Sequence, residues 1–193
     1  MPSKSKTARK RTAQKQPTHT KAKTKKANTL SAWGKVWRIA LAIAVPLGGG
    51  FIISLFTRDA MMKFADFNQP PLSPPAWLFP VAWTILYILM GIASYLIWKK
   101  GRDSNKSADK KLSRNTLIIY AVQLIFNFVW TPLFFILDQF WFAFVWLLAM
   151  WVMVLILMIK TRKISMPAFW MLLPYLLWCT FAAYLNCGIA ILN

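Results

Sequence analysis

The chain has 193 residues, of which 58% are hydrophobic and only 15% are charged. Its 24 Lys and Arg residues against five acidic residues give a formal net charge of +19. Soluble domains are about 45–50% apolar and about 25% charged, so this composition excludes most soluble enzymes. It also excludes a disordered polycation, because disorder requires low hydrophobicity. The balance is typical of a membrane protein with basic edges.

Residues 1–33 form a separate region at the N-terminus. Residues 1–26 hold ten Lys or Arg, no acidic residue and no apolar period, which predicts a disordered basic tail. The expected partner of this tail is anionic lipid, at about 1 kcal/mol for each basic residue near the membrane surface. Binding to polyanions would depend on salt, and we expect no specific nucleic-acid partner.

Five apolar runs follow, at about residues 37–56, 77–98, 116–137, 140–159 and 167–192. Each has the roughly 20 residues that a helix needs to cross the hydrocarbon core of a bilayer. Every backbone polar group must be hydrogen-bonded internally there, which favours helices. The sequence therefore predicts an all-α integral membrane protein, a bundle of five transmembrane helices in residues 34–193.

The connections between these runs alternate in charge. The segment up to Arg38 carries twelve Lys or Arg and no acid, whereas residues 99–114 have a net charge of +5 and residues 160–163 of +3. The first loop and the third connection carry no excess of basic residues. Because basic loops stay in the cytoplasm, we expect a cytoplasmic N-terminus and an extracytoplasmic C-terminus in a bacterial-type plasma membrane. Targeting to an organelle stays open, since the tail lacks acids as transit peptides do.

The usual catalytic constellations are absent from the sequence. The single histidine, His19, lies in the tail, and no His, Cys or carboxylate cluster has the spacing of metal ligands. No phosphate-binding glycine motif is present. No charged residue lies well inside an apolar run, which argues against proton-driven transport. We expect no metal, no required cofactor and no conventional catalytic site.

Aromatic and amide side chains share helix faces in three of the runs. At helical spacing they form the sets Trp83 and Tyr87; Gln123, Asn127 and Trp130; and Trp178, Ala182 and Leu185. One interpretation is that the amides join helices and the aromatic rings pack between them. The other is an aromatic-walled cavity with a few polar groups, the usual composition of a site for apolar ligands.

The first loop is rich in proline. Pro70, Pro71, Pro74 and Pro75 precede Trp77 at the start of the second run. Paired prolines hold the backbone extended without internal hydrogen bonds. The segment is predicted to be either a stiff cover over one mouth of the bundle or a plain rigid linker.

Taken in order, these motifs resemble the TspO/MBR family of tryptophan-rich sensory proteins and translocator proteins. The resemblance covers roughly residues 37–192. It rests on Pro46 with Gly48–Gly50, on the loop from Pro70 to Trp77, and on three helical segments: Pro80–Gly91, Gln123–Phe135 and Pro174–Asn186.

The resemblance implies a five-helix bundle, commonly a homodimer, with a pocket under the first loop. Family members bind porphyrins, haem-like tetrapyrroles, sterols and aromatic drugs. The positions here that match the family's pocket are Trp83, Asn127, Trp130, Trp178, Ala182 and Leu185. Trp83 and Trp178 match tryptophans linked to porphyrin breakdown in light, which makes them the candidate catalytic residues.

The expected function is that of a membrane receptor or sensor for protoporphyrin, other tetrapyrroles and apolar small molecules. Its role would lie in porphyrin homeostasis or stress response. Two alternatives stay open: a light-dependent porphyrin-degrading enzyme, and a transporter of porphyrins or sterols. Because the membrane domain has no histidine, tight binding should not depend on iron.

Overall fold

The computed structural model describes residues 32–193. The helices are α1 (Ala32–Met62), α2 (Leu78–Asp103), α3 (Ser107–Phe135), α4 (Phe140–Arg162) and α5 (Met166–Leu192), with a short 3-10 helix, η1 (Lys63–Asp66), after α1. The expected tail of residues 1–33 lies outside the described residues, except that Ala32 and Trp33 belong to α1. No strand occurs in residues 32–193. All five helices are long and apolar enough to cross a membrane, which confirms the predicted fold class.

The helices run past the apolar segments that predicted them, mostly at their charged ends. Helix α2 continues to Asp103, and α3 begins at Ser107, nine residues before the expected Thr116. Lys and Arg have high helix propensity, so hydrogen bonding continues beyond the hydrocarbon boundary. Asp109 in the first turn of α3 also interacts favourably with the positive end of the helix dipole.

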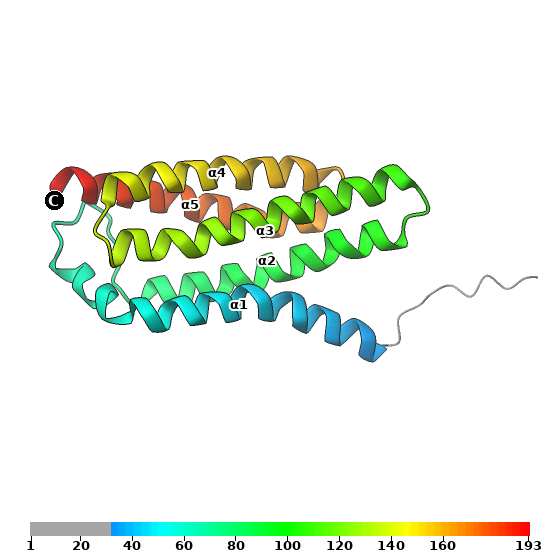
Figure 1. Ribbon diagram of the computed structural model, residues 1–193, viewed down its shortest axis with the longest axis horizontal. Helices are drawn as coiled ribbons and strands as arrows, with labels where there is room; N and C mark the ends of the chain where they lie inside the picture. Colours follow the sequence, from blue (N-terminus) through cyan, green and yellow to red (C-terminus); the bar gives the residue numbers. More distant parts are fainter. Residues whose placement is uncertain (1–31) are drawn as a thin grey trace, which may run out of the picture. The chain divides into compact units, whose positions relative to one another are not determined.

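The helices pack as an antiparallel bundle (Figure 1). Helix α2 contacts α1, α3 and α5, and α4 contacts α3 and α5, so that α1 and α5 lie on opposite sides of α2. The most deeply buried side chains come from α2 to α5 and include Met90, Leu147, Leu172 and Tyr175. Helix α1 lies at the edge of this packed group of four.

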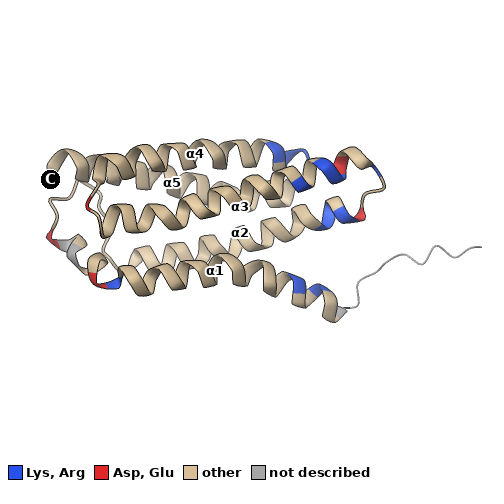
Figure 2. Cartoon of the chain, viewed as in Figure 1, with Lys and Arg blue, Asp and Glu red and all other residues tan. Residues whose placement is uncertain are grey.

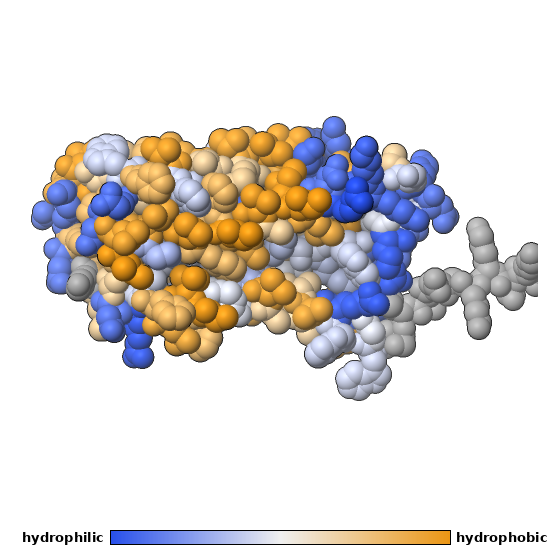
Figure 3. Space-filling model, in the orientation of Figure 1, coloured by the Kyte–Doolittle hydropathy of each residue, from blue (hydrophilic) through white to orange (hydrophobic). Residues whose placement is uncertain are grey.

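The surface has the character of a membrane protein. Lys and Arg gather at the end of the bundle where α1 begins, where α2 meets α3 and where α4 meets α5 (Figure 2). Apolar side chains cover the middle of the face shown in Figure 3. Large apolar residues such as Phe51, Ile125, Val145 and Leu177 are more than half exposed. Lipid is the solvent in which such a surface is stable.

Helix α1 is packed much less deeply than the others. Only 6% of its most apolar stretch is buried, against 33–44% for the other four helices. It approaches α2 closely at Gly91, where an added Cβ atom would lie 2.6 Å from the Cα atom of Ile43 and 2.8 Å from the carbonyl oxygen of Ala42. A glycine at this position lets the two backbones touch, as small residues do in membrane helix pairs.

The segment between α1 and α2 crosses the end of the bundle that carries few charges. Phe64 of η1 packs edge-on against Phe79 of α2, with ring centroids 5.1 Å apart, and lies 6.1 Å from Phe135 of α3. The segment then reaches the C-terminal end of α5, where the side chain of Asn193 accepts from the Asn68 N–H and donates to the Asn68 carbonyl, each at 3.0 Å. The first part of this segment is thereby held against α2, α3 and the end of α5.

Candidate functional site

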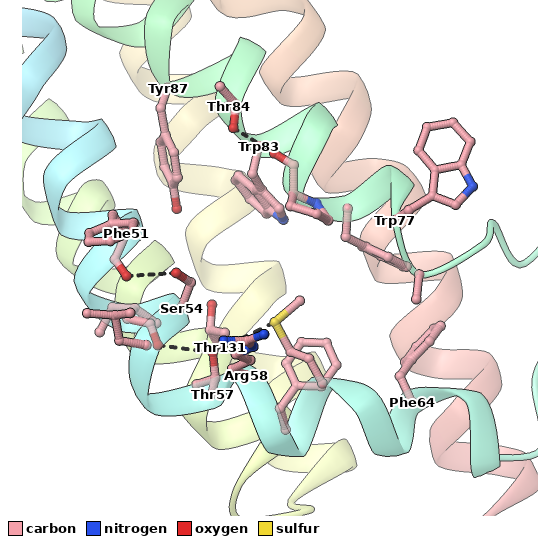
Figure 4. Close-up of a pocket in the computed structure, with 18 of the residues that line it drawn as sticks. Phe51, Ser54, Thr57, Arg58, Phe64, Trp77, Trp83, Thr84, Tyr87 and Thr131 are labelled. Atoms are coloured by element: carbon pink, nitrogen blue, oxygen red, sulfur yellow. Dashed lines mark hydrogen bonds between the residues drawn. The ribbon is translucent and has the colours of Figure 1, made fainter.

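A cavity of about 840 Å³ lies between α1, α2 and α3, next to η1. Its volume falls within the roughly 300–1,000 Å³ of small-molecule sites. Most of its lining is apolar, and α1 contributes one wall from Leu47 to Met62. Figure 4 shows Trp83 and Tyr87 of α2 facing α1 across this space. The arrangement is an apolar cavity with one aromatic wall.

Three of the predicted ligand-binding residues line this cavity: Trp83, Tyr87 and Trp130. Trp83 stacks on Tyr87 with a centroid distance of 5.5 Å, and Trp130 stacks on Phe134 at 5.4 Å. The indole N–H of Trp130 donates to Oδ1 of Asn186 at 3.2 Å. These contacts hold the rings in fixed orientations before any ligand arrives.

The predicted amides, Gln123 and Asn127, lie behind the cavity wall and do not line it. Asn127 accepts a hydrogen bond from the Tyr87 hydroxyl at 2.7 Å and donates to the Tyr175 oxygen at 3.3 Å. Tyr175 in turn donates to Oε1 of Gln123 at 2.8 Å. Unpaired polar groups are costly in a medium without water. The hydroxyl of Tyr175 joins the two amides, although Nε2 of Gln123 has no hydrogen-bond partner within the described residues. Their assignment as ligand contacts stays a prediction.

The predicted residues of α5 also lie away from the cavity. Trp178 packs edge-on against Trp83, with ring centroids 6.4 Å apart, and borders a shallow groove between α2 and α5. Ala182 and Leu185 are buried in the core. Because the Trp83 ring stands beside Tyr87, Tyr175 and Trp178, it separates the α5 side chains from the space next to α1.

The proline-rich loop spans from the end of α5 back to α2. Pro70 is buried against Gly188, and the Pro71 carbonyl accepts a hydrogen bond from the Tyr184 hydroxyl at 2.6 Å. Pro74 is half-buried and Pro75 is exposed. Trp77 lines the cavity, although 65% of its surface is exposed. Of the predicted cover residues, Trp77 alone borders the cavity itself.

Sequence reasoning missed the wall that α1 contributes. Gly50, Ser54 and Arg58 line the cavity at a spacing of four residues, with Thr57 beside them. The signal was present in the sequence, because this spacing puts the three residues on one face of a helix. Spacing alone, however, does not show which side of such an apolar helix faces a cavity.

Sequence comparisons place the chain among known proteins. A profile of the TspO/MBR family matches residues 42–192. The tryptophan-rich protein TspO of Chlorobaculum tepidum is 33% identical over 160 residues, which are 82% of this chain and 98% of that protein. The translocator protein of Ovis aries is 40% identical over 143 residues, 74% of this chain and 82% of that protein.

A third relative is the tryptophan-rich sensory protein of Cereibacter sphaeroides, 34% identical over 134 residues, which are 67% of this chain and 78% of that protein. The family match, over residues 42–192, includes most of α1 and the other four apolar helices that the structure describes. The chain belongs to the TspO/MBR family and is an integral membrane protein.

Proposed function

We propose that this protein is a membrane receptor that binds protoporphyrin and related apolar aromatic ligands in the cavity between α1, α2 and α3. The observation that supports this most directly is a cavity of about 840 Å³ walled by Trp83, Tyr87 and Trp130. Burial of a flat π-system there gains the hydrophobic free energy of its surface. Each well-placed aromatic contact adds about 0.5–1.5 kcal/mol.

We infer a role in porphyrin homeostasis or stress response. The name of one relative, a tryptophan-rich sensory protein, accords with the sensory part of this role. The sole histidine of the chain, His19, precedes the family match. The proposed site therefore offers no imidazole to a haem iron. Iron-free protoporphyrin should bind at least as tightly as haem, and a strict requirement for iron would contradict the proposal.

We infer that the basic end of the bundle faces the cytoplasm of a plasma membrane. The clustering of Lys and Arg at that end supports this orientation (Figure 2). The cavity and the proline-rich loop then lie toward the opposite, extracytoplasmic side. The basic tail would contact anionic lipid of the cytoplasmic leaflet.

The test is a titration of the detergent-purified protein with protoporphyrin in the dark, followed by tryptophan fluorescence. Ser54→Phe fills the cavity from α1 and should weaken binding by about tenfold or more, because the ligand and the new ring compete for one space. Ile52→Phe is the matched control, since Ile52 is exposed on the same helix and does not line the cavity. Equal affinity in the two variants would place the ligand elsewhere.

A second candidate function is light-dependent oxidation of the bound porphyrin, with dioxygen as the oxidant. It is favoured by the position of Trp83 in the cavity wall and by its edge-on contact with Trp178 at 6.4 Å. Illumination of the complex should then yield a discrete product that Trp83→Phe/Trp178→Phe does not form. Equal bleaching in both proteins would leave the receptor function alone.

A further inference from the structure

One charged residue borders the otherwise uncharged cavity. Arg58 is the only charged side chain among the lining residues of the described chain, and it lies on the last turns of α1. Figure 4 shows it on the same side of the cavity as Ser54, Thr57 and Thr131. The aromatic rings of Trp83 and Tyr87 stand opposite. The cavity therefore has an apolar body and a single cationic point near one end.

Three of the hydroxyl groups that line the cavity already donate hydrogen bonds to backbone carbonyls. The hydroxyls of Ser54 and Thr57 donate to the carbonyl oxygens of Phe51 and Ile53 in their own helix, at 2.7 Å and 3.0 Å. On the facing wall, Thr84 donates to the Pro80 carbonyl at 2.7 Å. In this arrangement these three side chains donate no hydroxyl proton to an anionic ligand.

The Arg58 guanidinium is differently placed. In residues 32–193, no carboxylate lies within ion-pairing distance of it. Its five N–H donors form a planar fork that matches the two oxygens of a carboxylate. Bidentate pairs of this kind are among the strongest hydrogen bonds that a protein makes.

We propose that Arg58 binds the carboxylate of an amphipathic aromatic ligand whose flat apolar part lies against Trp83, Tyr87 and Trp130. This inference rests on the proposed porphyrin-binding function and adds a requirement to it: the preferred ligand carries a carboxylate. Protoporphyrin satisfies the requirement through its propionates. Neutral aromatic ligands fill the same space without the ionic contact and bind more weakly.

The position of Arg58 decides how large the effect should be. Ion pairs between groups that are fully in water contribute little. Arg58 is exposed at the end of a membrane helix beside an apolar wall, where less water screens the charge and the attraction is stronger. We expect the carboxylate contact to account for about a tenfold difference in affinity.

The experiment compares protoporphyrin with its dimethyl ester, which keeps the ring and removes both charges. The full chain is held in phosphatidylcholine nanodiscs, and binding is followed in the dark by tryptophan fluorescence. Arg58→Gln should weaken binding of the acid about tenfold and of the ester less than about twofold. Arg58→Lys keeps the charge without the fork and should give an intermediate loss for the acid.

Arg162→Gln provides the matched control. It removes the same charge from an exposed helix end, that of α4, and lines no part of the cavity. It should leave both affinities unchanged. If Arg162→Gln weakened binding of the acid as much as Arg58→Gln does, the effect would come from net charge. The assignment of the carboxylate contact to Arg58 would then be wrong.

A lipid headgroup is the other source of an anion at this depth. If a lipid phosphate were the partner of Arg58, Arg58→Gln would alter the affinity for the acid in phosphatidylcholine, which carries a phosphate, but not in the uncharged, phosphate-free detergent dodecyl maltoside. That result would overturn the inference. An equal loss for acid and ester in Arg58→Gln would also overturn it, because a purely structural role affects both ligands.

The experiment distinguishes the proposed function from the role of Arg58. If the wild-type protein binds neither the acid nor the ester, the proposed function itself is wrong. If it binds both and Arg58→Gln is without effect, the cavity is the ligand site and only the role of Arg58 is wrong. If Arg58→Gln loses affinity for the acid but not for the ester, both the proposed function and the role of Arg58 are supported.

Discussion

The hydroxyl of Tyr87 donates a 2.7 Å hydrogen bond to Oδ1 of Asn127, which joins α2 to α3 directly behind the cavity wall. One face of the Tyr87 ring thus belongs to the ligand space, while its hydroxyl belongs to the core. Tyr87 therefore contributes both to the stability of the protein and to the ligand-binding surface. These two contributions can be separated by removing the Tyr87 hydroxyl and keeping the ring.

Tyr87→Phe should destabilise the protein by about 1–3 kcal/mol, because it leaves a buried amide oxygen without a donor. Porphyrin affinity should change by less than about threefold, since the aromatic surface stays in place. Thermal unfolding in detergent and a porphyrin titration measure the two effects. A large loss of affinity in a folded Tyr87→Phe protein would show that the ligand uses the hydroxyl itself.

Trp83→Leu should weaken porphyrin binding more than Trp178→Leu does. The Trp83 ring lines the cavity, and Trp178 lies behind it. We expect a loss of about tenfold for Trp83→Leu and of less than about threefold for Trp178→Leu. Equilibrium titration in the dark measures both values. The reverse order would mean that the ligand enters the bundle between α2 and α5, on the far side of Trp83.

The first loop is held to α5 by Asn193, which bonds Asn68, and by Tyr184, which bonds Pro71. The double substitution Tyr184→Phe/Asn193→Ala should speed porphyrin dissociation severalfold, since exposed hydrogen bonds contribute about 0.5–1.5 kcal/mol each. Stopped-flow displacement gives the rate. Asn105→Ala, in an exposed loop residue at the other end of the bundle, should not alter it. An unchanged rate in the double variant would show that the loop does not limit release.

Gly91→Ala should weaken the packing of α1 on α2. The new Cβ atom meets the backbone of Ile43 and Ala42, which cannot turn aside as a side chain would. Overpacking of this kind costs about 1–3 kcal/mol. Gly48→Ala is the control, because nothing lies within 4 Å of a Cβ atom there. Unfolding of both variants in detergent, followed by circular dichroism, should show a loss of stability at Gly91 only.

The sequence predicts the fold well because hydrocarbon imposes one requirement on every span. A run of about 20 apolar residues must form a helix that satisfies its own backbone. The helix ends were harder to place. Ser107 and Asp103 lie beyond the apolar limits, where ordinary helix propensity decides how far hydrogen bonding continues.

The candidate site was predicted only in part. Helical spacing brings Trp83 and Tyr87 together because it is a local property of α2. It gives no information on the packing of one helix against another. Asn127 therefore appeared equally suited to a ligand and to a tyrosine, and the structure pairs it with Tyr87 and Tyr175. Arg58 lies beyond the expected apolar run of residues 37–56, so hydropathy did not predict its place on α1.

The cavity has two unlike walls. The aromatic wall on α2 and α3 is anchored by the hydrogen bonds of Tyr87 and Trp130. The opposite wall is α1, whose most apolar stretch is only 6% buried. A wider ligand can be accommodated by displacing α1 into the lipid, while the aromatic wall on α2 and α3 keeps its shape. We expect the site to tolerate large differences in ligand size but little change in the flatness of the ring that stacks on it.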